Sequence, residues 1–190
     1  MHSFSDAPAG PQAPFHATTV LGIIHNGQVA LGADGQATMG NTVAKSKVTK
    51  IRELDEGQIL AGFAGATADA FTLIEKFEEK LSAHGGILRR AAVELAKEWR
   101  TDRYLRHLEA MMIVMTADDA LLVAGSGDVL EPEEGILAIG SGGNFALAAA
   151  HALKKHATNL TAEEMVREAL TIAADICIYT NHNLTIKSLS

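Results

Sequence analysis

Two adjacent threonines, Thr18 and Thr19, stand between a proline-rich leader and the first apolar run of the chain. A threonine hydroxyl is a weak nucleophile unless a base takes its proton. One such base is the residue's own α-amine, which is free only when the threonine is the first residue of the mature chain. That amine has a pKa of about 7.7 to 8.0, so a modest depression leaves it neutral at physiological pH. The simpler interpretation is a strand start, because the branched β-carbon of threonine favours extended backbone.

Asp34 and Lys50 are the charged residues suited to tuning such an amine. A lysine ammonium lowers the pKa of a nearby amine by like-charge repulsion, and a carboxylate can hold that lysine in place. Asp34 closes the second predicted strand and Lys50 lies on the third, so neighbouring strands of one sheet would bring both beside Thr18. Taken singly, each residue is better explained as a solvated charge at the end of a strand.

The glycine-rich stretch GSGGNF, residues 140–145, lies between a predicted strand and a predicted helix, where backbone amides can hold an anion. A dinucleotide fingerprint needs glycine or alanine at the position of Phe145, and the chain contains no GK[ST] triplet of a P-loop. Ser141 is not the serine of a GxSxG motif, which disfavours α/β-hydrolase chemistry. An anion-binding module centred on this stretch stays open as a weaker alternative.

Eight histidines and one cysteine offer few arrangements that bind a metal. No HExxH, HxH or cysteine–histidine cluster occurs, which disfavours a catalytic transition metal. The single cysteine, Cys177, excludes an internal disulfide. It lies in the apolar stretch DICIYT, which predicts a small buried hydrophobe in a helix and disfavours a reactive thiolate.

Composition favours one acidic globular domain. The chain has 190 residues, of which 47% are apolar, and its net charge is −7 with the basic residues scattered, which disfavours nucleic acid as a partner. No apolar run approaches the roughly 18 residues of a membrane span. Residues 1–17 hold most of the prolines and lack the basic and apolar regions of a secretory signal. We therefore expect a disordered leader over residues 1–17, one domain over residues 18–190 and a cytoplasmic protein.

Strands are predicted both before and after the first predicted helices. Two apolar runs meet around Asn26 and Gly27, a strong hairpin signal, and a second pair of runs meets at residues 55–57. Four strands therefore precede the first predicted helix. Later strand signals lie at residues 110–116, 120–127 and 135–143.

Helices are predicted in two pairs. Apolar residues recur at helical spacing over residues 66–86 and 88–108, and again after the GSGG stretch. Thr161 and Glu164 match a capping box that opens a last helix, which we expect to run to Thr180. The order of strands, two helices, strands and two helices predicts a layered α+β fold, because a parallel nucleotide-binding sheet would show regular βαβ alternation.

The chain resembles the HslV (ClpQ) peptidase family, the proteasome-related subunits of a two-component ATP-dependent protease. The resemblance extends from Ala17 to about Leu189 and is carried by ATTVLGIIHNGQVALGADGQATMGNTVAKSKVTKI, AGFAGATADAFTL, AAVELAKEWRTDR, AIGSGG and DICIYTNHN. It implies the N-terminal nucleophile hydrolase fold, a four-layer αββα sandwich of two antiparallel sheets between helical layers. It also implies two stacked hexameric rings, capped by the hexameric ATPase HslU, that degrade unfolded polypeptides.

The resemblance assigns roles to five residues. The family's nucleophile falls on Thr18, and Asp34 and Lys50 take the places of the charged residues that tune its amine. Gly62 in AGFAG matches the backbone donor to the oxyanion, a contact that stabilises a tetrahedral intermediate. Ser141 matches a serine near the amine.

The resemblance also implies a bound monovalent cation, which we expect to be sodium. Its ligands would be main-chain carbonyls in the segment that contains Ala174, Cys177 and Thr180. Alanine stands at residue 174 where glycine is expected, a mild departure because the ligand is a carbonyl. No nucleotide is expected to bind this chain, so the ATPase motor must be another protein.

The leader is the larger departure from the family. In many relatives the catalytic threonine follows the initiator methionine, whereas residues 1–17 precede Thr18 here. Self-cleavage at the Ala17–Thr18 bond is expected to free the amine, and a start codon assigned too early would explain the leader equally well. The main functional alternative is an unprocessed, non-catalytic ring subunit.

Overall fold

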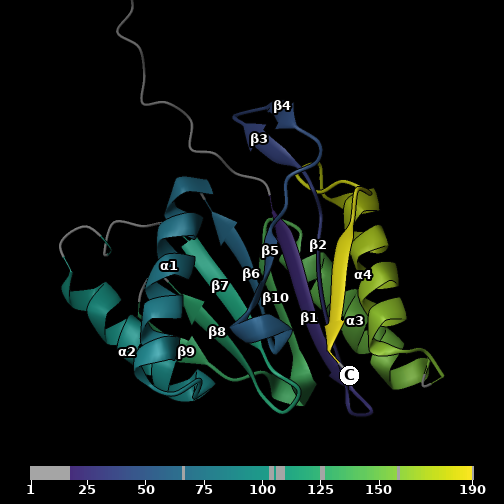
Figure 1. The fold of residues 1–190 in the computed structure, drawn as a ribbon. Coiled ribbons are helices and arrows are strands. Elements are labelled where there is room, and N and C mark those ends of the chain that lie inside the picture. The colour runs from purple at the N-terminus through teal and green to yellow at the C-terminus, as the bar shows by residue number, and fades with distance from the viewer. Residues whose placement is uncertain are drawn as a thin grey trace, which may run out of the picture.

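The computed structural model of the chain describes residues 18–65, 67–102, 105, 110–124, 127–157 and 159–189. Over these residues, two antiparallel sheets lie face to face between two layers of helices (Figure 1). This arrangement confirms the expected α+β sandwich. The predicted leader, residues 1–17, lies outside the described residues.

The first sheet has the strand order β10-β1-β2-β11, and each neighbouring pair is antiparallel. Its hairpin turn is the predicted one. Asn26 (φ 50°) and Gly27 (φ 74°) both adopt the left-handed conformation that this two-residue turn requires. The strands are β1 (Thr19–His25), β2 (Gln28–Ala33), β10 (Ile136–Gly140) and β11 (Thr185–Leu189).

The second sheet has the strand order β5-β6-β7-β8-β9 and is also antiparallel throughout. The predicted turn between its first two strands is a short 3-10 segment, Asp55–Gly57, in which Glu56 has a φ of 54°. The strands are β5 (Ile51–Leu54), β6 (Ile59–Gly65), β7 (Ala110–Met115), β8 (Ala120–Ala124) and β9 (Val129–Leu130).

Two further strands, β3 (Ala37–Met39) and β4 (Thr42–Lys45), form a separate hairpin beside the sandwich (Figure 1). Residues 18–65 therefore contain six strands, and the prediction of four before the first helix is wrong. β4 is exposed along its whole length, so burial imposes no apolar alternation on its sequence. The polar edge strand β11 and the short strand β9 escape prediction for a similar reason.

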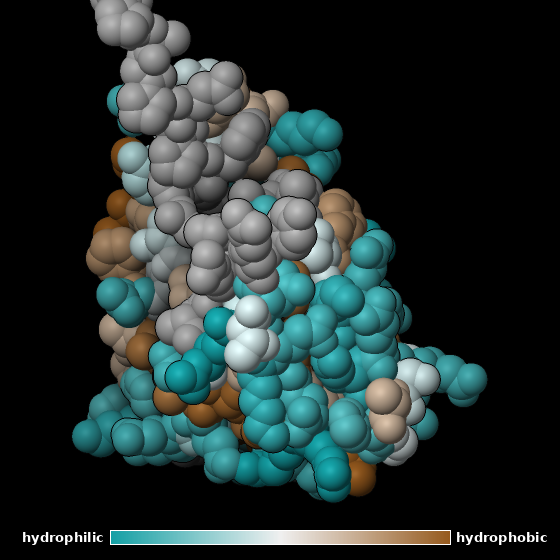
Figure 2. All heavy atoms as spheres, turned by 90° about the vertical axis from the view of Figure 1, so that its left-hand side faces the viewer, coloured by the Kyte–Doolittle hydropathy of each residue, from teal (hydrophilic) through white to brown (hydrophobic). Residues whose placement is uncertain are grey.

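Helices α1 (Thr67–Ala83) and α2 (Leu88–Thr101) cover the outer face of the second sheet (Figure 1). The predicted apolar stripes face inward, because Phe77 and Trp99 are fully buried in the core between these helices and the sheet. The lower part of this helical layer presents a mainly hydrophilic surface (Figure 2). α2 ends at Thr101, short of the predicted end at residue 108.

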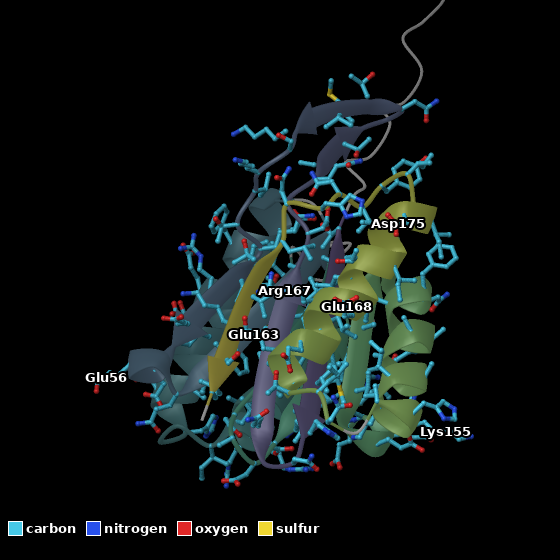
Figure 3. All side chains as sticks on the ribbon, turned by 90° about the vertical axis from the view of Figure 1, so that its right-hand side faces the viewer. Glu56, Lys155, Glu163, Arg167, Glu168 and Asp175 are labelled. Atoms are coloured by element: carbon cyan, nitrogen blue, oxygen red, sulfur yellow. The ribbon has the colours of Figure 1, made fainter. Side chains whose placement is uncertain are left out.

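Helices α3 (Gly143–His156) and α4 (Ala162–Ile176) cover the outer face of the first sheet, and Figure 3 looks onto them. The predicted capping box is confirmed. Thr161 Oγ1 accepts from the Glu164 amide at 3.2 Å, and Glu164 Oε2 accepts from the Thr161 amide at 2.8 Å. These two bonds satisfy amides that the first turn of α4 leaves without partners inside the helix.

α4 ends at Ile176, so the prediction that it runs to Thr180 is wrong. Cys177 is the residue after the helix, with extended backbone (φ −91°, ψ 114°), and it is buried as predicted. Past the helix end Cys177 and Thr180 are buried whereas Ile178 is exposed, so the apolar stretch DICIYT does not form one continuous helical face. No helix among the described residues has both the length and the apolar character needed to cross a membrane.

The core between the two sheets holds the strands of the candidate site in place. Val20 and Leu31 of the first sheet pack in one cluster with Leu60 and Ile113 of the second. A Cβ atom on Gly62 would lie 2.7 Å from Val20 Cγ1, so the two sheets approach closely at that point. The ends of β1, β2 and β6 are thereby fixed relative to one another.

Candidate active site

Thr18 lies directly before β1 and is buried, with 5% of its surface exposed. Its carbonyl oxygen accepts from the Ser141 amide at 2.8 Å. Gly140, whose φ is 89°, lies so close that an added Cβ would sit 1.9 Å from the Thr18 carbonyl oxygen. The glycine-rich turn after β10 thus fixes the backbone of the predicted nucleophile.

Asp34 follows β2, is almost fully buried and accepts four hydrogen bonds. Its Oδ1 accepts from the Thr19 amide and from Lys50 Nζ, both at 2.8 Å. Its Oδ2 accepts from the amides of Gln36 at 2.8 Å and Asn181 at 3.2 Å. One carboxylate therefore joins the threonine pair, the lysine and two loops.

Lys50 precedes β5 and is buried, with 3% of its surface exposed. Burial lowers the pKa of Lys50 below 10.5, and the attraction and hydrogen bond of Asp34 act in the opposite direction. The two residues belong to different sheets, so the prediction that neighbouring strands of one sheet bring them together is wrong. The pair forms across the sandwich, where the ends of β2 and β5 meet.

Thr19 begins β1 and also makes side-chain hydrogen bonds in the candidate site. It is fully buried, its Oγ1 accepts from the Gly142 amide at 2.9 Å, and the same oxygen lies 2.7 Å from Thr180 Oγ1. The amides of Ser141 and Gly142 thus have partners within the protein, namely the carbonyl of Thr18 and the hydroxyl of Thr19. This occupancy disfavours the anion-binding module centred on GSGG.

The two remaining predicted catalytic residues are Ser141 and Gly62. The Ser141 backbone contacts Thr18, whereas Ser141 itself is exposed, so its role near the amine stays a prediction. Gly62 lies in β6 between Ile51 of β5 and the facing residue of β7. Phe63 N donates toward β5, to Lys50 O at 3.2 Å. Since successive amides of a strand point to opposite sides, the Gly62 amide points toward β7. Its role as oxyanion donor stays a prediction that this register does not favour.

The predicted cation segment lies at the end of α4. Ala174 is in the last turn, where carbonyls lack their usual helical partners and carry the negative end of the helix dipole. The Cys177 carbonyl accepts from the Thr180 amide at 3.0 Å and retains a second lone pair. The described residues contain no cluster of three or more His, Cys, Asp or Glu side chains that could hold a metal. Carbonyl ligation fits this segment, and the cation stays a prediction.

The sequence alone does not predict the hydrogen bonds that the Thr19 and Thr180 hydroxyls make, nor those of Gln36 and Asn181. Gln36 Nε2 donates to the Ile178 carbonyl at 2.9 Å, which ties the loop after β2 to the loop after α4. These contacts join residues more than 100 positions apart, so no local pattern reveals them. The only signal is the polar run NHN after Thr180.

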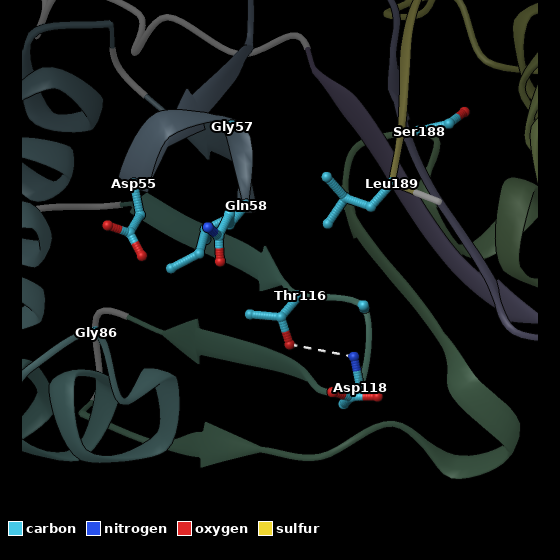
Figure 4. A pocket seen from close by; sticks show the side chains of 10 residues that line it. Asp55, Gly57, Gln58, Gly86, Thr116, Asp118, Ser188 and Leu189 are labelled. Atoms are coloured by element: carbon cyan, nitrogen blue, oxygen red, sulfur yellow. Dashed lines mark hydrogen bonds between the residues drawn. The ribbon is translucent and has the colours of Figure 1, made fainter.

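A cavity of about 540 Å³ lies at the other end of the sandwich, where β11 ends (Figure 4). Asp55, Thr116, Asp118 and Leu189 are among the residues that line it. Thr116 Oγ1 accepts from the Asp118 amide at 3.4 Å. None of the predicted site residues lines this cavity, so its position separates it from the cluster around Thr18.

Comparison with known proteins identifies the relatives of this chain. Residues 14–189 match the proteasome subunit family. The ATP-dependent protease subunit HslV of Cytophaga hutchinsonii is 66% identical over 173 residues, which cover 91% of this chain and 96% of that protein. The subunit of the same name from Amoebophilus asiaticus is 63% identical, with 92% and 97% covered.

Solved structures agree with these sequence matches. Eukaryotic HslV from Trypanosoma brucei superposes with a TM-score of 0.86 at 46% identity, covering 90% of this chain and 99% of that one. BPH from Thiobacillus denitrificans has a TM-score of 0.68 at 20% identity, covers 90% and 97%, and supports the fold alone. Because sequence identity and fold agree over almost the whole of the described sandwich, the chain belongs to the HslV family of proteasome-type subunits.

Proposed function

We propose that this chain is the threonine peptidase subunit of an ATP-dependent protease, and that Thr18 becomes its nucleophile once residues 1–17 are removed. The observation that carries the proposal is the double acceptance by Asp34 Oδ1, which binds Lys50 Nζ and the Thr19 amide at 2.8 Å each. One oxygen atom thereby holds an ammonium group beside the backbone of the threonine pair. Identity to HslV subunits over most of the chain supports the same conclusion.

The reaction proceeds in two halves. In the first, Thr18 Oγ1 attacks the carbonyl carbon of a peptide bond while the α-amine of Thr18 takes the hydroxyl proton. The intermediate collapses as that proton passes to the leaving nitrogen, which leaves an ester on Thr18. In the second half, the amine takes a proton from water, the resulting hydroxide attacks the ester, and the acid product leaves as the proton returns to Oγ1.

Lys50 and Asp34 act on the pKa of the Thr18 α-amine. The Asp34 carboxylate favours the ammonium form of Lys50, which burial alone would disfavour. A positive charge held there lowers the pKa of the neighbouring α-amine by repulsion, so a larger fraction of the amine is neutral near pH 7 and able to act as a base. Before removal of residues 1–17, the same nitrogen is an amide and cannot act as a base.

We also propose partners and a cellular location for this chain. The chain lacks a P-loop triplet, so ATP hydrolysis is assigned to a separate hexameric ATPase of the HslU type. We assign the chain to two stacked hexameric rings in the cytoplasm, with unfolded polypeptides as substrates. Sodium is the proposed cation, held by the carbonyls of Ala174, Cys177 and Thr180, where it would stabilise the loop that positions the Thr180 hydroxyl.

Intact mass of the purified protein, compared with Thr18→Ala, tests the nucleophile. The wild type is expected to lose residues 1–17, and Thr18→Ala is expected to keep them, because the hydroxyl that cleaves the Ala17–Thr18 bond is missing. The processed wild type, combined with its ATPase, should cleave a fluorogenic peptide, whereas Thr18→Ala should not.

A shortened chain that begins Met-Thr18 is the control for the leader, since host enzymes trim the methionine. Activity of this chain would support Thr18 as nucleophile even if the full-length wild type stayed uncut. An inactive shortened chain that still assembles would favour a non-catalytic ring subunit and overturn the proposal.

A further inference from the structure

The loop after α4 contains one side chain that bridges three chain segments, that of the half-buried Asn181. Its Oδ1 accepts from the amides of Gly35 and Asn183, both at 3.1 Å. Its Nδ2 donates to the Ser46 carbonyl at 2.9 Å, and its own backbone amide donates to Asp34 Oδ2 at 3.2 Å. The carboxamide therefore both accepts and donates hydrogen bonds.

These contacts reach Asp34 of the buried ion pair and the segment that leads to Lys50. Asp34 is bound directly, and Gly35 is its neighbour in sequence. Ser46 opens the segment that leads to Lys50, and the Val48 amide in the same segment donates to the Gly35 carbonyl at 2.8 Å. The segment that carries the lysine is therefore fixed to the loop that carries the aspartate, with Asn181 attached to both.

The packing leaves little freedom in this junction. A Cβ atom on Gly35 would lie 2.8 Å from the Ser46 carbonyl oxygen and 3.1 Å from the Asn183 carbonyl oxygen. Asn183 Nδ2 donates to the same Ser46 oxygen at 2.9 Å. Because the backbones are nearly in contact, the two segments have little room to approach further, and the Asn181 carboxamide is hydrogen-bonded to both.

We infer that Asn181 is a positioning residue for the proposed reaction. Its carboxamide sets the spacing between the Asp34 loop and the Lys50 segment, and so the place of the Lys50 ammonium relative to the Thr18 amine. The inference rests on the proposed function. An uncharged side chain suits this place, because aspartate at residue 181 would have nearly the same shape but would add a second negative charge beside Asp34.

The test uses the processed wild type assembled with its ATPase, and Asn181→Ala and Asn181→Asp prepared in the same way. For Asn181→Ala we expect kcat to fall about 10- to 100-fold at nearly constant KM, since a misplaced group away from the bond that is cut slows the chemical step. The acid limb of kcat/KM should move to higher pH, because a displaced ammonium lowers the pKa of the amine less. Asn181→Asp should move this limb further, because the added negative charge favours the protonated amine.

Asn159→Ala is the matched control, since Asn159 is an exposed asparagine in the connection between α3 and α4. It should leave kcat, KM and the pH profile unchanged. None of these substitutions replaces His182 or Asp175, whose Nε2 and Oδ1 atoms lie 3.1 Å apart near the site. Melting temperature and assembled mass are recorded for each protein.

The outcomes separate the inference from the function on which it rests. Thr18-dependent cleavage that Asn181→Ala leaves unchanged in kcat and in pH profile would overturn the inference alone. A wild type without Thr18-dependent cleavage would overturn the proposed function and the inference with it. If Asn181→Ala does not fold, the nearly isosteric Asn181→Asp, which cannot donate to the Ser46 carbonyl, carries the test. Its kcat is compared with that of the wild type on the plateau above the acid limb, where the added charge no longer changes the protonation of the amine, and an unchanged plateau counts against the inference.

Discussion

At the scale of single residues, the candidate site depends on two charged side chains that are buried, where an isolated charge is energetically unfavourable. The side chains of Asp34 and Lys50 are 0% and 3% exposed, and their atoms meet at 2.8 Å. The cost is offset because Asp34 also accepts three backbone amides, so neither of its oxygens is left without donors. Such an arrangement is destabilising if one partner alone is removed.

Lys50→Met is expected to lower the free energy of unfolding by about 3 to 5 kcal/mol near pH 7, because it leaves the buried Asp34 carboxylate without its cation. The pH dependence has a definite sign. Burial lowers the pKa of Lys50 below 10.5, so between the lowered pKa and 10.5 the unfolded chain binds more protons than the folded chain. The stability of the wild type relative to Lys50→Met should therefore rise with pH across this window.

Urea unfolding of both proteins at a series of pH values measures this difference. Lys50→Arg is a useful companion, since it keeps the charge but changes the shape of the donor. A stability difference between wild type and Lys50→Met that is constant across the window would mean that burial does not depress the pKa of Lys50.

At the scale of elements, the turn after β10 matters because its backbone, more than its side chains, contacts Thr18. Gly140 has a φ of 89° and approaches the Thr18 carbonyl more closely than any side chain would allow. The amide of Ser141 then binds the same carbonyl at 2.8 Å. A glycine is therefore needed here for space as well as for conformation.

Gly140→Ala is expected to abolish both leader removal and peptide cleavage, because its Cβ would lie 1.9 Å from the Thr18 carbonyl oxygen and force the two backbones apart. Gly57→Ala is the matched control. Gly57 also has a φ of 89°, but nothing lies within 4 Å of an added Cβ. It should lose only the roughly 1 to 2 kcal/mol that a left-handed residue costs, and keep its activity. Intact mass and peptide cleavage measure the two effects, and an active, processed Gly140→Ala would contradict the account of this turn.

The elements that sequence predicts well are those with local signals. The turn at Asn26 and Gly27 and the capping box at Thr161 depend on residues within a few positions of one another, and both are confirmed. β11 pairs with β2 from the far end of the chain, and its residues are only partly buried, so neither turn chemistry nor apolar alternation reveals it. In the hairpin of β3 and β4 only Thr38 is buried, and every residue of β4 is exposed, so no apolar alternation marks it.

At the scale of the whole molecule, the candidate site exists only because two sheets meet (Figure 1). Asp34 comes from the first sheet and Lys50 from the second, while Thr180 reaches Thr19 from 161 residues away. Composition and periodicity predict the layers, and the family resemblance predicts which residues matter. Neither predicts that the ion pair crosses the sandwich, because that depends on how the two sheets pack.

The end of α4 presents a cluster of apolar side chains to solvent. Ile172 and Ile176 are 40% and 55% exposed and lie one helical turn apart, and Ile178 in the following turn is 78% exposed. Single exposed apolar residues are common, but three within seven residues form an apolar patch, and we expect a neighbouring subunit to cover it. Since Gln36 Nε2 binds the Ile178 carbonyl, the backbone beneath this cluster is fixed beside the candidate site.

Ile178→Ser is therefore expected to shift the protein from assembled to smaller species, because it would remove apolar area from this expected subunit contact, while Ile178 itself lies outside the core. The unfolding free energy of the isolated chain should change by no more than about 0.5 kcal/mol, as for other surface substitutions. Ile178→Val, which keeps an apolar side chain, should assemble like the wild type. Native mass spectrometry measures the distribution of species, and an Ile178→Ser protein that assembles fully would show that this cluster lies outside the contacts between subunits. Peptide cleavage should fall in parallel with assembly, since the loop that carries Ile178 also holds Thr180 and Asn181 against the threonine pair and the buried aspartate.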